Sequence, residues 1–324
     1  MIRLAVLIAL VLTICITGSS AFIRHTQAGV GCPARDACRV STAAPANTAV
    51  TSRDGPGQET ASRDAPGQAI ASQAAEPSAD VRTARLMHRV SAMAVGLLAG
   101  IIALVGWSSL RGSERAAAAF ALLVTGALAW LGRYTPHDLP LVTLGNVLGG
   151  FALAAGFAWI AAPAPPPGTA RRPLGLLAVA LLLVFVQAGL GVMISVRHAV
   201  DACAALVCLP AEAIDWRLFN PLVAGLPESV GGAQALHLAH RLSALGLLAV
   251  CLAVTLRTRG AARLAVVGLL LLQGLLGFAT ATGQQPLLAA TAHNMTAAAL
   301  VALITVMAAQ AVKPAPRDVR TGGA

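Results

Sequence analysis

The chain has 324 residues, of which 57% are hydrophobic and only 11% are charged, and its mean hydropathy is +0.75. These values exclude a soluble globular domain and predict an all-α polytopic membrane protein. The formal net charge of +10 does not predict a nucleic-acid partner, because the arginines fall in short loops between apolar segments rather than on one basic face.

Eight apolar stretches have the length that an α-helix needs to span about 30 Å of hydrocarbon. They cover residues 4–22, 86–107, 115–131, 139–161, 173–194, 234–256, 261–280 and 286–311. We interpret all eight as membrane spans, with the lipid bilayer as the partner that covers their outer faces. The first stretch also has features of a cleaved signal peptide, since Arg3 precedes it and small residues follow it.

The basic residues indicate how the chain crosses the membrane. Every second loop carries a group of them and the C-terminal tail adds more: Arg111 and Arg115, then Arg171 and Arg172, then Arg257, Arg259 and Arg263, then Lys313, Arg317 and Arg320. The positive-inside rule therefore predicts that both termini are cytoplasmic. We expect a multi-pass protein of a bacterial inner membrane, with the cysteine-bearing loops in the periplasm.

Two segments belong to no predicted span. Residues 39–80 are rich in Ala, Ser, Pro, Gly and Asp and contain a near-repeat, SRDGPGQ and then SRDAPGQ. They hold too few large apolar residues to bury a core, so we expect a disordered periplasmic insertion. The Pro-rich segment 163–173 is typical of a stiff linker and divides the chain into an N-terminal half, 1–165, and a C-terminal half, 166–324.

The two halves share short motifs at matching positions. Residues 86–93 are LMHRVSAM and residues 238–245 are LAHRLSAL. Ile-Arg-His at 23–25 ends the first span of one half, as Val-Arg-His at 196–198 ends the first span of the other. This pattern predicts a parallel internal duplication, in which two similar four-helix bundles make up the protein.

Three histidines lie near the outer ends of predicted spans: His88, His240 and His293. A histidine in hydrocarbon needs a partner, so each either hydrogen-bonds a neighbouring helix or binds a ligand. His240 and His293 occupy the sixth and eighth spans, where they could face each other as the two axial ligands of a haem iron. Zinc fits less well, because neither span offers a Cys, Asp or Glu near its histidine. The other histidines are assigned to loops or span boundaries: His25, His137, His198 and His237.

Arginines accompany these histidines. Arg89 and Arg241 directly follow His88 and His240. Because arginine binds carboxylates in a bidentate way, both are candidates for contacts to haem propionates. Arg24 and Arg197 are further candidates, with snorkelling of the guanidinium to the headgroup region as the alternative.

Four of the six cysteines form two spaced pairs in outer loops, Cys32 with Cys38 and Cys203 with Cys208. An oxidising periplasm favours a structural disulfide in each loop, and a redox-active pair or free thiols remain open. All 13 acidic residues fall outside the predicted spans, which argues against an ion-driven transporter.

A longer pattern joins these motifs. The first half contains G-x5-R-x-T-x2-G-x-G-C-P-x4-C, formed by Gly18, Arg24, Thr26, Gly29, Gly31, Cys32, Pro33 and Cys38. The second half contains QAGLGVMIS at 187–195, LQGLLG at 272–277 and His293-Asn294. With the two His-Arg motifs, this set resembles the heme A synthase family, eight-helix membrane enzymes that oxidise the C8 methyl of heme O to the formyl of heme A. The resemblance covers the chain apart from the insertion and the tails.

The resemblance implies a heme b ligated by His240 and His293, and a site for heme O around His88 and Arg89. It implies heme O as substrate and heme A as product. A heme O synthase, an electron donor and a second copy of the chain are implied as partners. Two positions depart from the family pattern: Arg85 stands where the family has a glutamate, and Asn146 stands where it has a histidine.

Two other functions remain open. Arg85 and Asn146 are compatible with a haem-binding paralogue that lacks synthase activity and acts in haem handling or electron transfer. The two cysteine pairs are compatible with a quinone-linked thiol oxidoreductase, although the duplication and the lack of a Cys-x-x-Cys motif disfavour it.

Overall fold

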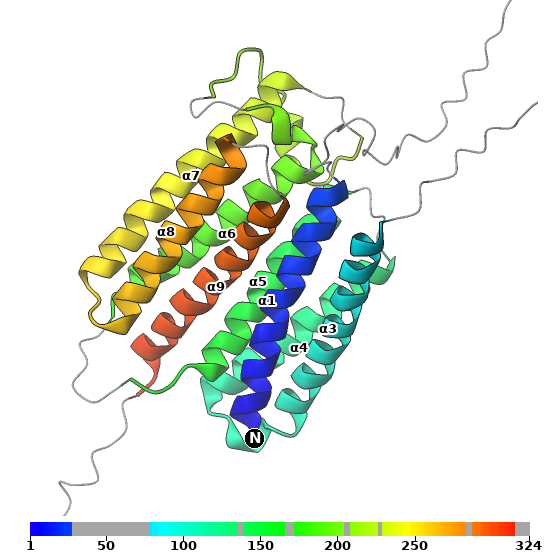
Figure 1. Cartoon of the computed structure of the whole chain (residues 1–324). Coiled ribbons are helices and arrows are strands. Elements are labelled where there is room, and N and C mark those ends of the chain that lie inside the picture. Colours follow the sequence, from blue (N-terminus) through cyan, green and yellow to red (C-terminus); the bar gives the residue numbers. More distant parts are fainter. Residues whose placement is uncertain are drawn as a thin grey trace, which may run out of the picture.

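The computed structural model describes residues 1–27, 78–134, 139–165, 172–203, 208–225, 229–282 and 287–314. Within them, eight α-helices are long and apolar enough to cross a membrane (Figure 1). They are α1 (Ile2–Gln27), α3 (Ala79–Leu104), α4 (Gly112–Tyr134), α5 (Pro140–Ala161), α6 (Leu174–Val196), α7 (Val230–Leu256), α8 (Ala261–Thr282) and α9 (Leu287–Val312). The described residues also form three short 3-10 helices, η1 (Trp107–Ser109), η2 (Ala199–Asp201) and η3 (Trp216–Phe219), and no strand. The predicted all-α, multi-pass membrane fold is confirmed.

Two helices begin earlier than predicted because polar residues cap them. The hydroxyl of Ser78 accepts from the backbone N–H of Val81 at the start of α3, and Ser229 does the same for Gly232 at the start of α7. Asp80 in the first turn of α3 further favours a helix start there. Residues 79–80, predicted to belong to the disordered insertion, are therefore helical, and the rest of that insertion lies outside the described residues.

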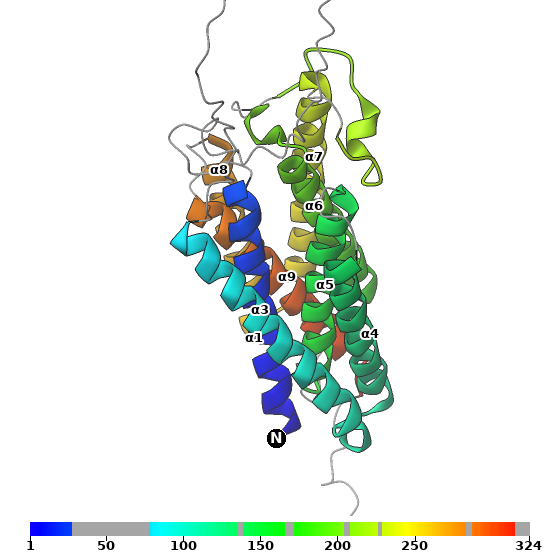
Figure 2. The same cartoon turned by 90° about the vertical axis from the view of Figure 1, so that its right-hand side faces the viewer.

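The described helices pack as two rings of four in the same cyclic order. Neighbours in the first ring are α1, α3, α4 and α5, and neighbours in the second are α6, α7, α8 and α9. The rings meet where α9 packs against α1 and α5, and where α5 packs against α6 (Figures 1 and 2). This arrangement fits two similar bundles, and the duplication of the sequence itself stays a prediction.

The helices bury small and branched side chains between them and leave large apolar side chains on the outside. Phe157 and Leu177 are fully buried in the cores of the first and second ring. By contrast, Leu123 on α4 and Leu264 and Leu271 on α8 are each about 70% exposed. Hydrocarbon around the protein covers such side chains at no cost, so this surface is the one expected of a membrane-embedded bundle.

A buried ion pair joins the two rings at the end of the bundle where α1 begins and α9 ends. Lys313, the only lysine of the chain, follows α9, and its side chain is 3% exposed. Its Nζ lies 2.8 Å from Oε1 of Glu114 on α4 and also donates to the carbonyls of Trp159 and Ala162 at the end of α5. Because all three donors of the ammonium are used, the C-terminus of α9 is fixed against the first ring.

Candidate functional site

His240 on α7 faces α6. Its Nε2 atom lies 3.0 Å from Nε2 of Gln187, and Oε1 of Gln187 accepts from the hydroxyl of Ser243, one turn after His240. An amide NH2 only donates, so Nε2 of His240 accepts and the ring proton is on Nδ1. Gly191, one turn after Gln187, makes room for the ring: a Cβ atom there would lie 3.3 Å from Cε1 of His240.

His293 on α9 is held by α8 in the same way. Its Nε2 atom lies 3.1 Å from Nε2 of Gln273, and a Cβ atom on Gly277 would lie 3.2 Å from its Cε1 atom. The spacing Gln-x3-Gly therefore occurs twice, once opposite each histidine. It places an amide donor and a gap on the same face of a helix, because residues four apart are neighbours there.

The two histidines belong to opposite corners of the second ring, since α7 and α9 are not neighbours in it. Nδ1 of each ring is buried and has no hydrogen-bond partner among the described residues. Leaving such a group unpaired is costly, so the pair is more than apolar packing. His240 lies ten residues after the start of α7, which is about 15 Å along the helix axis.

Helix α1 of the first ring contributes a buried cation next to Asn294, the residue after His293. The Nη2 atom of Arg24 on α1 donates to Oδ1 of Asn294 at 3.0 Å, and the residue is only 9% exposed. Its Nε and Nη1 atoms are buried, and nothing in the described part of the chain accepts from them. The alternative in which Arg24 snorkels to the headgroups is therefore wrong. His25, predicted to lie in a loop or at a span boundary, lies two residues before the end of α1 and contacts Nδ2 of Asn294 at 3.3 Å.

The first ring carries the other copy of the motif with fewer partners. His88 on α3 is partly buried, and its Nδ1 atom has no hydrogen-bond partner among the described residues, while Arg85 and Arg89 are exposed. Asn146 lies partly buried on α5, the corner of the ring opposite α3. Aligning the two Arg-His dipeptides places Ile14 where the second ring has Gln187. The amide that contacts His240 thus has an apolar counterpart here.

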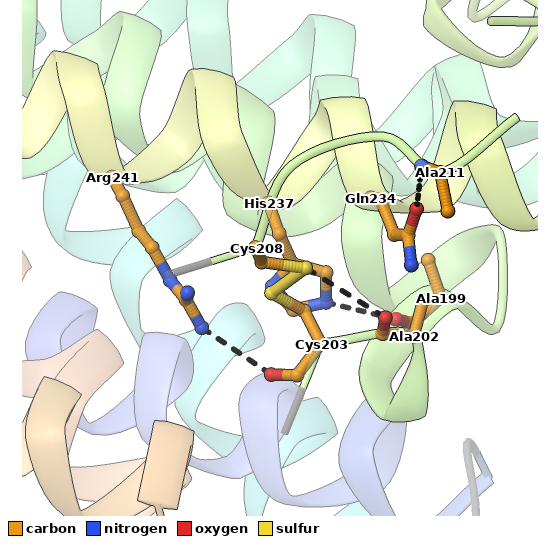
Figure 3. The surroundings of a disulfide bond; sticks show 8 residues. All are labelled: Ala199, Ala202, Cys203, Cys208, Ala211, Gln234, His237 and Arg241. Atoms are coloured by element: carbon orange, nitrogen blue, oxygen red, sulfur yellow. Dashed lines mark hydrogen bonds between the residues drawn. A yellow bond between two sulfur atoms is a disulfide. The ribbon is translucent and has the colours of Figure 1, made fainter. Parts of the chain in front are cut away.

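Cys203 and Cys208 form a disulfide in the outer loop after η2 (Figure 3). Three residues on one face of α7 bind this loop. Oε1 of Gln234 accepts from the N–H of Ala211, and Nε2 of His237 contacts the carbonyl of Ala199 at 2.8 Å. Nη2 of Arg241 donates to the carbonyl of Cys203. Arg241, predicted to bind a propionate, thus also holds the loop above His240. Cys32 and Cys38 lie outside the described residues.

Arg197 occupies the position that matches Arg24 but makes different contacts. Its Nε and Nη2 atoms donate to the carbonyls of Leu218 and Asn220, which fixes the loop around η3. Burial lowers the pKa of Arg197 from its usual value, and the carboxylate of Asp215 acts in the opposite direction. The contacts of its guanidinium therefore assign Arg197 to the loop.

Sequence reasoning missed the residues that position the two histidines: Gln187, Gln273 and Ser243. The repeated Gln-x3-Gly spacing was the available signal for the glutamines, and the serine of the His-Arg-x-Ser motif was the signal for Ser243. Neither signal identifies its partner, because Gln187 lies 53 residues before His240 in the chain.

Comparison with known proteins gives one result on the family. No curated protein matches the chain. The family model of COX15-CtaA, described as cytochrome oxidase assembly protein, matches residues 3–305, which include all eight described spanning helices apart from the end of α9. The chain therefore belongs to the cytochrome oxidase assembly protein family, the family of the heme A synthases.

Proposed function

We propose that this protein is a heme A synthase-type oxidoreductase that converts the C8 methyl of heme O to the formyl of heme A. The observation that carries the proposal is the pair His240 and His293, two imidazoles at opposite corners of one four-helix ring, each contacted at Nε2 by a glutamine amide. Membership of a family that acts in cytochrome oxidase assembly supports the same reaction class.

The residues of the second ring fit a heme b. A neutral imidazole is the form that ligates haem iron, so His240 and His293 would hold a heme b. The amides of Gln187 and Gln273, which contact the two Nε2 atoms in this structure, would have to move off those atoms for them to bind the iron. Gly191 and Gly277 keep side chains away from both rings. When bound, the haem supplies one-electron chemistry at its iron, and the chain supplies its position and its apolar surroundings.

Arg24 is the residue that we assign to a haem propionate. A buried guanidinium whose Nε and Nη1 atoms have no acceptor is unfavourable without a counterion, and a carboxylate accepts N–H groups from both nitrogens at once. Asn294 orients the group from the second ring. Arg241 is a second candidate at the loop end of the site, whereas we assign Arg197 to loop binding.

We assign the substrate, heme O, to the first ring. In this proposal His88 binds the substrate and Arg89, exposed beside it, binds a propionate. The first ring thereby orients the methyl group that reacts, and the surrounding helices exclude water. Conversion of a methyl to a formyl removes four electrons and adds one oxygen atom, so the reaction also requires an oxidant and a source of oxygen. A heme O synthase and an electron donor for the heme b are the proposed protein partners. The proposed setting is a bacterial inner membrane with both termini in the cytoplasm.

Two residues favour a second candidate function, a haem-binding paralogue without synthase activity. Arg85 provides no carboxylate near His88, so it offers no general base there. Asn146 is a weaker iron ligand than an imidazole. Expression in a host that lacks heme A synthase separates the two functions: appearance of heme A rules out the paralogue, and its absence with heme b still bound rules out the synthase.

The test of the heme b site is pyridine-haemochrome analysis and the visible spectrum of purified protein. We expect a low-spin heme b in the wild type and its loss when His240→Ala and His293→Ala are combined, because both axial ligands are removed. His198→Asn is the matched control, since His198 is exposed and its positive φ of 51° suits asparagine. A low-spin haem that survives the double substitution would refute the assignment.

A further inference from the structure

A cavity of about 550 Å³ opens at the end of the bundle opposite the histidines, where α1 begins. Its lining includes Arg3 on α1, Ser109 and Arg111 before α4, Glu114 on α4 and Lys313 after α9. The cavity thus joins segments from both ends of the chain, and its two arginines come from separate segments.

The charges of this cavity leave the two arginines available to a ligand. Glu114 uses Oε1 for Lys313 and Oε2 for the backbone N–H of Arg111. Glu114 and Lys313 therefore neutralise each other. No other acidic residue of the described chain lines the cavity, so Arg3 and Arg111, both exposed, give it a net positive charge of about two.

An apolar groove lies on α1, next along the helix from the residues of α1 that line the cavity. Leu7, Ile8, Val11 and Leu12 line it, and its volume is about 250 Å³. Arg3, Leu7 and Val11 are four residues apart, so they follow one another along one face of the helix. A cationic end and an apolar continuation on the same face match the two parts of a lipid.

Trp107 marks the depth of the cavity in the membrane. It lies in η1 next to Ser109, is 45% exposed, and has the guanidinium of Arg115 5.8 Å from its ring centroid. Tryptophan with arginine at a helix end is typical of the membrane–water interface. The cavity therefore lies at the level of lipid headgroups, and on the cytoplasmic side in the proposed orientation.

We propose that this cavity binds the phosphodiester of an anionic phospholipid through Arg3 and Arg111, with an acyl chain in the groove formed by Leu7, Ile8, Val11 and Leu12. Guanidinium groups bind phosphate oxygens in a bidentate way, and basic pockets between helices on the cytoplasmic side are suited to anionic headgroups. The apolar groove favours a lipid over free phosphate, because free phosphate would leave it unused. This proposal is independent of haem binding.

The test is native mass spectrometry of the full-length protein in detergent, titrated with phosphatidylglycerol, phosphatidylcholine or inorganic phosphate. We expect preferential retention of phosphatidylglycerol by the wild type. The double variant Arg3→Gln/Arg111→Gln should bind it about 30-fold more weakly, given a factor of about five for each basic residue near a headgroup. Haem content should be unchanged.

The matched control is Arg257→Gln/Arg259→Gln, which removes the same charge from an exposed loop outside the cavity. Equal losses in both double variants would show attraction to general surface charge and overturn the proposal. Equal retention of phosphatidylglycerol and phosphatidylcholine would overturn it as well. Displacement of phosphatidylglycerol by millimolar inorganic phosphate would overturn the lipid assignment.

Discussion

Gln187 and Gln273 distinguish the two copies of the His-Arg motif. In the second ring each histidine has an amide donor on the neighbouring helix, and Ser243 fixes the amide of Gln187. In the first ring Ser91 keeps its place in the motif, but the position that matches Gln187 is Ile14. Among the residues described, the shared serine thus has a glutamine partner in the second ring only. We expect different ligand geometry at His88 and His240.

Replacing the amides tests whether they position the histidines. Gln187→Leu and Gln273→Leu keep similar volume but remove the hydrogen bonds that orient the imidazoles. We expect each to raise the affinity for heme b by up to about fivefold, the value of one hydrogen bond that the iron no longer has to displace from Nε2, and to change the low-spin spectrum of the bound haem. Gln234→Leu on α7 is the control, because its amide binds the disulfide loop instead. Unaltered haem affinity and spectrum in both variants would contradict a positioning role.

At the scale of helices, hydropathy predicts which segments cross the membrane but not where they begin. The starts of α3 and α7 depend on Ser78 and Ser229, polar residues outside the apolar windows. At its C-terminal end, α1 extends beyond the predicted limit of residue 22 to Gln27 and so includes His25, which the sequence assigned to a loop or span boundary. Histidines of the site could be predicted because a motif marks them. Their glutamine partners could not, because only helix packing brings α6 to α7 and α8 to α9.

The Gln-x3-Gly faces of α6 and α8 give a prediction at this scale. Gly191→Ala and Gly277→Ala would each place a methyl group 3.2 to 3.3 Å from an imidazole carbon, closer than ordinary contact. We expect lower heme b content, measured per mole of purified protein. Gly274→Ala is the control on α8, because its added Cβ meets nothing within 4 Å and alanine favours the helix by up to about 1 kcal/mol. Equal haem content in the site variants and the control would contradict the steric argument.

In the whole molecule, side-chain hydrogen bonds and an ion pair join the two rings at both ends of the bundle. Arg24 and Asn294 connect α1 to α9 beside the histidines, and Lys313 connects α9 to α4 and α5 at the other end. Near the histidine end as well, a Cβ on Gly18 would lie 2.6 Å from the sulfur of Met295, so α1 and α9 approach closely there. A cofactor in the second ring would therefore depend on a residue of the first, and separated halves should bind it poorly.

The buried ion pair tests how strongly the rings are joined. Lys313→Met leaves Glu114 without its counterion and leaves two backbone carbonyls without their donor. We expect the free energy of unfolding to fall by on the order of 2 kcal/mol. This loss is smaller than for a fully buried pair because the side chain of Glu114 is 15% exposed. Thermal unfolding in detergent measures the loss. Adding Glu114→Gln should recover part of it, because the unpaired charge is then removed. Heme b content of the folded fraction should stay constant, since both residues lie at the end away from His240 and His293. A double variant less stable than Lys313→Met would show that Glu114 stabilises the bundle through contacts other than this pair.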